Sequence, residues 1–148
     1  MKYPIGIQSF DQIREEGYVY VDKTALVYDL AQNGKIYFLS RPRRFGKSLL
    51  ISTLKHYFLG HKALFQGLAM EQLEKEWTVY PVFHLDFNGG NFMQQGALRE
   101  RIEAYLSNWE REYHIDNTSL DLGLRFSVVL QKAHRQTGQR AVVLIDEY

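Results

Sequence analysis

Three short runs rich in apolar residues, each as long as a β-strand, govern how this 148-residue chain can fold. They occupy residues 36–39, 81–87 and 141–145. A continuous apolar run of this length is typical of a parallel strand covered on both faces. Long amphipathic stretches separate the runs, and strands that alternate with helices indicate a parallel sheet between helical layers. The sequence therefore predicts an α/β fold.

The amphipathic stretches predict the helices. Ser9 and Gln12 have the spacing of a capping box, which indicates a short first helix. Residues 22–24 offer caps for a second helix, which residues 33–34 (Asn-Gly) end. A third helix starts near Gly46 and ends at Gly60, whereas the stretch from Leu64 to Trp77 has no clear pattern. The apolar residues expected on the buried faces of the second and third helices are Leu26, Val27, Leu30, Ala31, Leu50, Ile51, Leu54, Tyr57 and Phe58.

Two more helices are expected between the second and third strands. Gly138 stops the later of the two. The residues that share a helical face are Leu98, Ile102, Tyr105, Leu106, Trp109 and Tyr113 in the first, and Leu122, Phe126, Val129, Leu130 and Ala133 in the second.

Residues 40–48 (Ser-Arg-Pro-Arg-Arg-Phe-Gly-Lys-Ser) resemble a phosphate-binding loop. The usual Walker A pattern is Gly, four residues, then Gly-Lys-Ser/Thr. Gly46-Lys47-Ser48 matches the second half, while Arg41 stands where the first glycine belongs. An apolar strand precedes the loop and an amphipathic helix follows it, as the pattern requires. The tripeptide alone would also fit a helix start with an exposed lysine.

The chemistry of a nucleotide explains these residue types. Backbone N–H groups of the loop and of the helix start satisfy phosphate oxygens, and Gly46 lets the backbone come close. Lys47 can reach the β- and γ-phosphates, and the Ser48 hydroxyl can ligate Mg²⁺. Arg43 and Arg44 are open to two interpretations, added phosphate or partner contacts and solvated loop charges. The residues expected to bind the nucleotide are Arg41, Pro42, Arg43, Arg44, Phe45, Gly46, Lys47, Ser48 and Leu49.

Two carboxylates follow the third strand. Asp146 and Glu147 come at its C-terminal end, the edge where ligands bind in open parallel sheets. An Asp here can hold Mg²⁺ together with the loop hydroxyl, and the following Glu can activate the attacking water. Adjacent strand residues point to opposite faces, so the two carboxylates can serve separate tasks. An apolar strand that ends in solvated acids is the alternative.

Other chemistries find less support. Asp86 is interpreted as a turn or cap residue with Asn88, and approach to the site is the alternative. The histidines show no metal-ligand spacing, and no Ser-His-Asp set can be argued. The chain has no cysteine, which excludes disulfides, thiolate zinc sites and a cysteine nucleophile.

With these motifs in hand, the chain resembles the bacterial AAA-ATPase-like family, whose longer members often carry a C-terminal restriction-endonuclease-like (PD-(D/E)XK) domain. The likeness covers essentially the whole chain. The matching residues are 4–10, 20–24, 41–48, 81–87 and 143–148.

The resemblance implies a three-layer P-loop NTPase fold of the AAA/ASCE type, with ATP and Mg²⁺ as ligands. It implies magnesium at Ser48 and Asp146, and catalytic roles for Lys47 and Glu147. On this resemblance we expect residues 1 to about 34 to form a lead-in segment and residues 35–148 an incomplete nucleotide-binding core. Relatives place a later strand, with a sensor residue, between the loop strand and the Walker B strand, which ends at Asp146. We therefore expect a fragment truncated after the Walker B strand, with a sheet gap that invites aggregation.

Three functions remain open. The first is Mg²⁺-dependent hydrolysis of ATP by this chain or by a longer protein of which it is the N-terminal part. The second is a nucleotide-sensing interaction module that binds without turnover. The third is a small-molecule P-loop kinase, which a water-activating Glu147 makes less attractive.

The composition indicates where the protein is located and which partners it can have. Hydrophobic residues make up 45% and charged residues 24%, as in soluble globular proteins. No stretch resembles a signal peptide or a membrane span, so a cytoplasmic location is expected. The net charge of +1 gives no general reason to expect nucleic acid, although the basic loop leaves it open. The sequence also leaves open a homo-oligomer or a protein partner, and it does not specify the biological role or the base preference.

Overall fold

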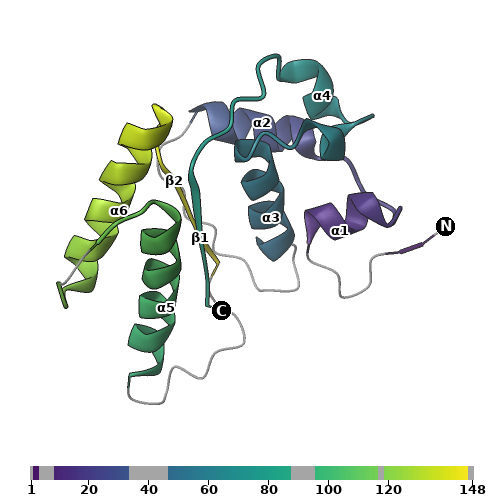
Figure 1. Cartoon of the computed structure of the whole chain (residues 1–148). Coiled ribbons are helices and arrows are strands. Elements are labelled where there is room, and N and C mark those ends of the chain that lie inside the picture. Colours follow the sequence, from purple (N-terminus) through teal and green to yellow (C-terminus); the bar gives the residue numbers. More distant parts are fainter. Residues whose placement is uncertain (1, 4–8, 34–46, 88–95, 117–118, 147–148) are drawn as a thin grey trace. The chain divides into compact units, whose positions relative to one another are not determined.

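The computed structural model describes residues 2–3, 9–33, 47–87, 96–116 and 119–146, and of Asn33 and Lys47 it describes the backbone. It divides into two compact units, Met1–Val79 and Tyr80–Tyr148, and each is described by itself (Figure 1). Helices and a small parallel sheet make this a mixed α/β protein, as predicted. The domain boundary expected at residues 34/35 stays a prediction.

The first unit is helical in its described residues. Helix α1 contacts α3 and the 3-10 helix η2, and α2 contacts α3 and α4 (Figure 1). The stretch that had no clear pattern in the sequence contributes the end of η2 and all of α4. The bounds are α1 Phe10–Glu15, α2 Thr24–Asn33, α3 Lys47–Phe58, η2 Lys62–Phe65 and α4 Ala69–Leu73.

Aromatic side chains form the centre of this unit. Phe10 and Phe65 are fully buried, and their ring centroids lie 4.8 Å apart. Trp77 packs on Phe65 at 5.2 Å. The backbone N–H of Phe10 donates to Ser52 Oγ at 2.9 Å, which fixes the start of α1 against α3. Packing and one specific hydrogen bond therefore position α3.

Two predictions for this unit are wrong in detail. Leu26 was expected in the core of α2 but is 70% exposed, because the buried positions are Thr24, Val27 and Ala31, which lie on another side of the helix. Ser9 precedes α1 but makes no side-chain cap; its hydroxyl instead donates to the carboxylate of Asp11. The remaining apolar residues predicted on the buried faces of α2 and α3 are buried or half-buried.

The second unit holds the sheet. Strands β1 (Val82–Asp86) and β2 (Val142–Asp146) pair in parallel, in register from Val82↔Val142 to Asp86↔Asp146. Helices α5 (Ala97–Glu112) and α6 (Leu122–Thr137) lie between them in sequence (Figure 1). Two parallel strands need a long crossover connection, and the two helices provide it. The order strand, helix, helix, strand predicted from the sequence is confirmed for this unit. The strand predicted at residues 36–39 lies outside the described residues.

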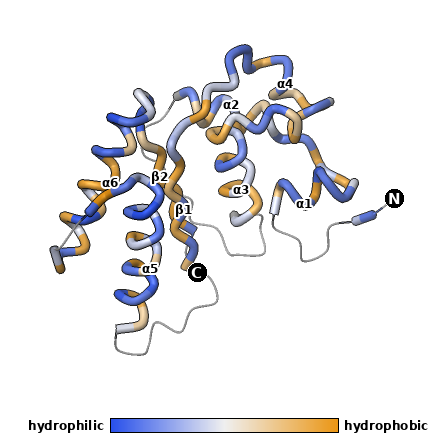
Figure 2. Tube along the Cα trace, in the orientation of Figure 1, coloured by the Kyte–Doolittle hydropathy of each residue, from blue (hydrophilic) through white to orange (hydrophobic). Residues whose placement is uncertain are grey.

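One face of β1 packs on both helices. Leu98 was expected in this core but is 45% exposed, near the start of α5. Figure 2 shows hydrophobic residues alternating with hydrophilic ones along α5 and α6, as expected for helices that bury one side. The buried core consists of Phe83 and Leu85 from β1, Leu106 and Trp109 from α5, and Val129 and Ala133 from α6.

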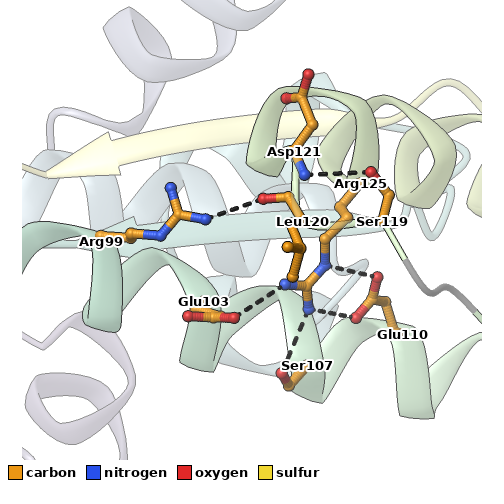
Figure 3. Close-up of polar contacts among 8 residues, drawn as sticks. All are labelled: Arg99, Glu103, Ser107, Glu110, Ser119, Leu120, Asp121 and Arg125. Atoms are coloured by element: carbon orange, nitrogen blue, oxygen red, sulfur yellow. Dashed lines mark hydrogen bonds and ion pairs between the residues drawn. The ribbon is translucent and has the colours of Figure 1, made fainter.

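A buried ion pair joins the two helices. Arg125 of α6 donates to both carboxylate oxygens of Glu110 on α5, at 2.7 and 3.1 Å (Figure 3). Asp121 caps α6 by accepting from the Leu124 N–H, and Gly138 ends the helix with φ +74°, as the sequence predicts. None of the described helices is long and apolar enough to cross a membrane.

Candidate functional site

The N-terminus of α3 carries the end of the predicted phosphate loop. The helix begins at Lys47, and Ser48 lies in its first turn with 8% of its surface exposed. The first N–H groups of a helix have no intrahelical partner, and they favour an anion. The first turn of α3 contains no acidic residue, and Lys55 and His56 lie in its last turn. No acidic side chain of the first turn thus competes with a phosphate for this helix end.

Most of the loop lies outside the described residues. This applies to Arg41, Pro42, Arg43, Arg44, Phe45 and Gly46, and to the side chain of Lys47. Leu49 is half-buried within α3, and its carbonyl accepts from the Thr53 hydroxyl at 2.8 Å. The nucleotide contacts predicted for the loop therefore stay predictions.

Asp146 ends β2 and is almost fully buried, with 4% of its surface exposed. Its Oδ1 atom has no hydrogen-bond partner within the described part of the chain. A buried carboxylate oxygen without a partner is energetically costly, and a bound cation removes that cost. The oxygen atom thus has the environment expected of a metal ligand.

The described residues indicate which kind of metal Asp146 could hold. Within the described residues, no group of three or more His, Cys, Asp or Glu residues could hold a metal ion. Mg²⁺ needs no such group, because proteins typically bind it through one or two carboxylates together with phosphate oxygens and water. A single buried Asp146 and a hydroxyl from Ser48 are in keeping with that chemistry.

The two residues predicted to hold Mg²⁺ lie in different units. Ser48 belongs to the first unit and Asp146 to the second, and each unit is described by itself. Their meeting at one cation stays a prediction. Glu147, the predicted water-activating residue, lies outside the described residues.

The structure adds one residue to the acidic edge. Asp86 ends β1 as Asp146 ends β2, and the two are partners in the parallel register. The sequence interpretation favoured a turn or cap role for Asp86. The sequence does contain a signal for two acidic strand ends, because residues 82–86 and 142–146 are each four mostly apolar residues followed by Asp.

Comparison with known proteins identifies the family. The model of a family described as "Predicted AAA-ATPase" (AAA-ATPase-like) matches residues 4–148. A protein of Azotobacter chroococcum mcd 1, named "Uncharacterized protein in vnfD 5'region", is 42% identical over 149 residues, which cover 99% of this chain. The chain spans 29% of that relative's length. No solved structure matches. The family match over residues 4–148 shows that this chain belongs to the predicted AAA-ATPase-like family.

Proposed function

We propose that this chain forms the nucleotide-binding part of a Mg²⁺-dependent ATPase. The observation that carries the proposal is the buried Oδ1 of Asp146 at the C-terminal end of a parallel strand, which has no hydrogen-bond partner among the described residues. Strand ends of open parallel sheets are where ligands bind, and an acidic residue there is the usual magnesium-holding group of P-loop NTPases. The Gly46-Lys47-Ser48 sequence motif supplies the matching phosphate-binding half.

Each residue of the proposed site has a distinct role. The first-turn N–H groups of α3 and the Lys47 ammonium bind phosphate oxygens and orient the nucleotide. Ser48 and Asp146 would hold Mg²⁺, which when bound neutralises the charge on the phosphates. Residues 41–45 and Leu49 complete the nucleotide-binding segment.

Hydrolysis requires one further group. Glu147 follows Asp146 directly in the sequence, and neighbouring residues of an extended chain can serve separate tasks. In this proposal the Glu147 carboxylate would accept a proton from the attacking water, and Asp146 would hold the metal. ATP turnover, the three-layer P-loop arrangement with residues 36–39 in the same sheet, and any partner of the longer protein are all parts of this proposal.

A titration with a fluorescent ATP analogue and Mg²⁺ tests nucleotide binding. We expect Lys47→Ala to weaken binding, because the ammonium that neutralises the phosphates is lost. Lys55→Ala is the matched control, since Lys55 lies in the last turn of the same helix. Equal affinities for wild type and Lys47→Ala would refute the phosphate site.

Phosphate release separates turnover from sensing. Under the ATPase proposal, Glu147→Gln retains nucleotide binding and loses steady-state phosphate release. A protein that binds ATP but releases no phosphate, with or without this substitution, would be a nucleotide sensor instead. Transfer of the γ-phosphate to an acceptor other than water would indicate a kinase.

A further inference from the structure

The ends of β1 and β2 bring two carboxylates side by side. Asp86 and Asp146 are register partners, and partners in a parallel pair point to the same face of the sheet. Adjacent strands lie about 5 Å apart, so the two side chains start at that separation. The residue before each Asp, Leu85 in β1 and Ile145 in β2, points to the other face of the sheet. The face that carries both carboxylates is therefore opposite the one on which Leu85 packs against α5 and α6.

Helix α5 fixes the end of β1. The Tyr105 hydroxyl accepts from the backbone N–H of Asp86 at 3.1 Å and donates to its carbonyl at 3.2 Å. The Arg101 guanidinium donates to the same carbonyl at 3.0 Å. One residue further, the Phe87 N–H donates to the Asp146 carbonyl at 2.8 Å. These contacts hold the two strand ends in one relative position.

The register places two acidic side chains next to each other at one sheet edge. Like charges directly opposite one another on neighbouring strands destabilise a sheet. Asp146 is 4% exposed and its Oδ1 has no partner within the described residues, so water screens this charge poorly. A divalent cation bound between the two carboxylates would offset the repulsion between them and give Asp146 Oδ1 a partner. Proteins typically bind Mg²⁺ through one or two carboxylates.

We propose that Asp86 and Asp146 together form a two-carboxylate site for a divalent cation. The proposal rests on the proposed function for the identity of that cation as the Mg²⁺ that accompanies the nucleotide. It assigns to Asp86 a metal-binding role in addition to any turn or cap role. The carbonyl contacts from Tyr105 and Arg101 position this residue.

Binding of Mn²⁺ without nucleotide tests the site directly. Free Mn²⁺ is measured by electron paramagnetic resonance in titrations of the full chain. We expect Asp86→Asn and Asp146→Asn each to weaken Mn²⁺ binding about tenfold or more, since each removes one of two charged ligands. Asp116→Asn removes an exposed carboxylate from the same unit and should match wild type. Wild-type affinity in Asp86→Asn would overturn the proposal.

A second measurement does not depend on the variants folding. Bound Mn²⁺ broadens the amide resonances of residues close to it in the wild-type chain. We expect broadening at both Asp86 and Asp146, and Mg²⁺ should reverse it by competition. Broadening that spares both residues would refute the site. Because adjacent strands lie about 5 Å apart, broadening locates the metal at this edge, and the Asp86→Asn titration decides whether both carboxylates hold it.

The experiments distinguish a failure of the two-carboxylate site from a failure of the proposed nucleotide site. If Lys47→Ala leaves ATP affinity unchanged while Asp86→Asn loses Mn²⁺, the nucleotide site is refuted and the cation site stands. If Lys47→Ala loses ATP and Asp86→Asn retains both Mn²⁺ binding and the effect of Mg²⁺ on ATP affinity, only the role of Asp86 is refuted. If the site is as proposed, Asp86→Asn binds ATP without metal as wild type does, and gains less affinity from Mg²⁺.

Discussion

Arg125 is buried because Glu110 on the facing helix pairs with it. The side chains of Arg125 and Glu110 are 9% and 10% exposed and form a bidentate ion pair, and Glu103 adds a contact at 3.3 Å (Figure 3). The sequence prediction left Arg125 off the buried face of α6, although it lies next to Phe126. Periodicity marks where apolar residues face, but the burial of a charge depends on a partner from another helix, which no local pattern reveals.

We expect Arg125→Ala to lower the free energy of unfolding by about 3–5 kcal/mol, because the Glu110 charge would stay buried without its partner. Urea unfolding followed by circular dichroism measures this. The double variant Arg125→Ala/Glu110→Ala should lose less than the sum of the two single variants. Arg99→Ala is the control, because Arg99 makes an exposed contact to the Leu120 carbonyl. Additive losses in the double variant would contradict the pairing.

Asp22 joins two helix starts through one carboxylate. Oδ1 accepts from the N–H of Thr24 at 2.9 Å and from its hydroxyl at 2.6 Å, and Oδ2 accepts from the Ala69 N–H at 2.8 Å. Partial burial raises the pKa of Asp22, but the bonds from Thr24 and Ala69 outweigh it and hold the pKa below its usual value. The ionised form is therefore favoured in the folded state.

The pH dependence of Asp22 follows from this direction. A carboxyl whose folded pKa lies below the unfolded value of about 3.9 contributes stability above that pH and loses it as pH falls through the folded pKa. We expect Asp22→Ala to cost about 1 kcal/mol at neutral pH, as lost caps do. The gap to wild type should narrow as pH falls below about 4. Urea unfolding at several pH values, with Glu15→Ala as control, checks it. A constant gap would contradict the ionic role.

At the scale of elements, α6 is the helix that the sequence predicts best. Its stop at Gly138 and its apolar face at Phe126, Val129 and Ala133 are as expected. The signal is strong because the helix is long and its terminal glycine takes a left-handed conformation that other residues avoid. The capping box at Ser9 failed because a hydroxyl there has a nearby carboxylate to bind instead.

We expect Asp121→Ala to destabilise α6 by about 1 kcal/mol, because the Leu124 N–H loses its side-chain acceptor. Asp121→Asn should retain most of the stability, since Asn caps helices nearly as well. Thermal unfolding of the two variants beside wild type measures the difference. Equal losses for Ala and Asn would indicate that the charge of Asp121, rather than its cap, matters.

At the scale of the whole molecule, the sequence predicts the order of elements but not which strand ends meet. The α/β class and the parallel pairing follow from apolar runs that alternate with amphipathic helices. The pairing of Asp86 with Asp146 depends on the register, which long-range packing sets. Long-range packing also sets the distance between Ser48 and Asp146, so no local sequence pattern predicts it.

The sheet also leaves apolar surface in contact with solvent. Val143 and Ile145 are 38% and 49% exposed on one face of β2, whereas the register partner of Ile145, Leu85, is 9% exposed. We expect Ile145→Thr to reduce aggregation of the chain, measured by light scattering, with little change in its melting temperature. Leu85→Thr should lower the melting temperature by several degrees, because it removes buried apolar volume. Unchanged aggregation in Ile145→Thr would contradict the role of this surface.

The crossover between β1 and β2 has a consequence for how the protein is made. Both long helices, α5 and α6, must be synthesised and folded back before the second strand can meet the first. Contacts between segments so distant along the chain form late, after the local helical ones, because closing a long loop costs entropy. The edge at which Asp86 and Asp146 meet therefore forms only after β2 has been made, and a chain that has reached only α6 would lack the cation site proposed there.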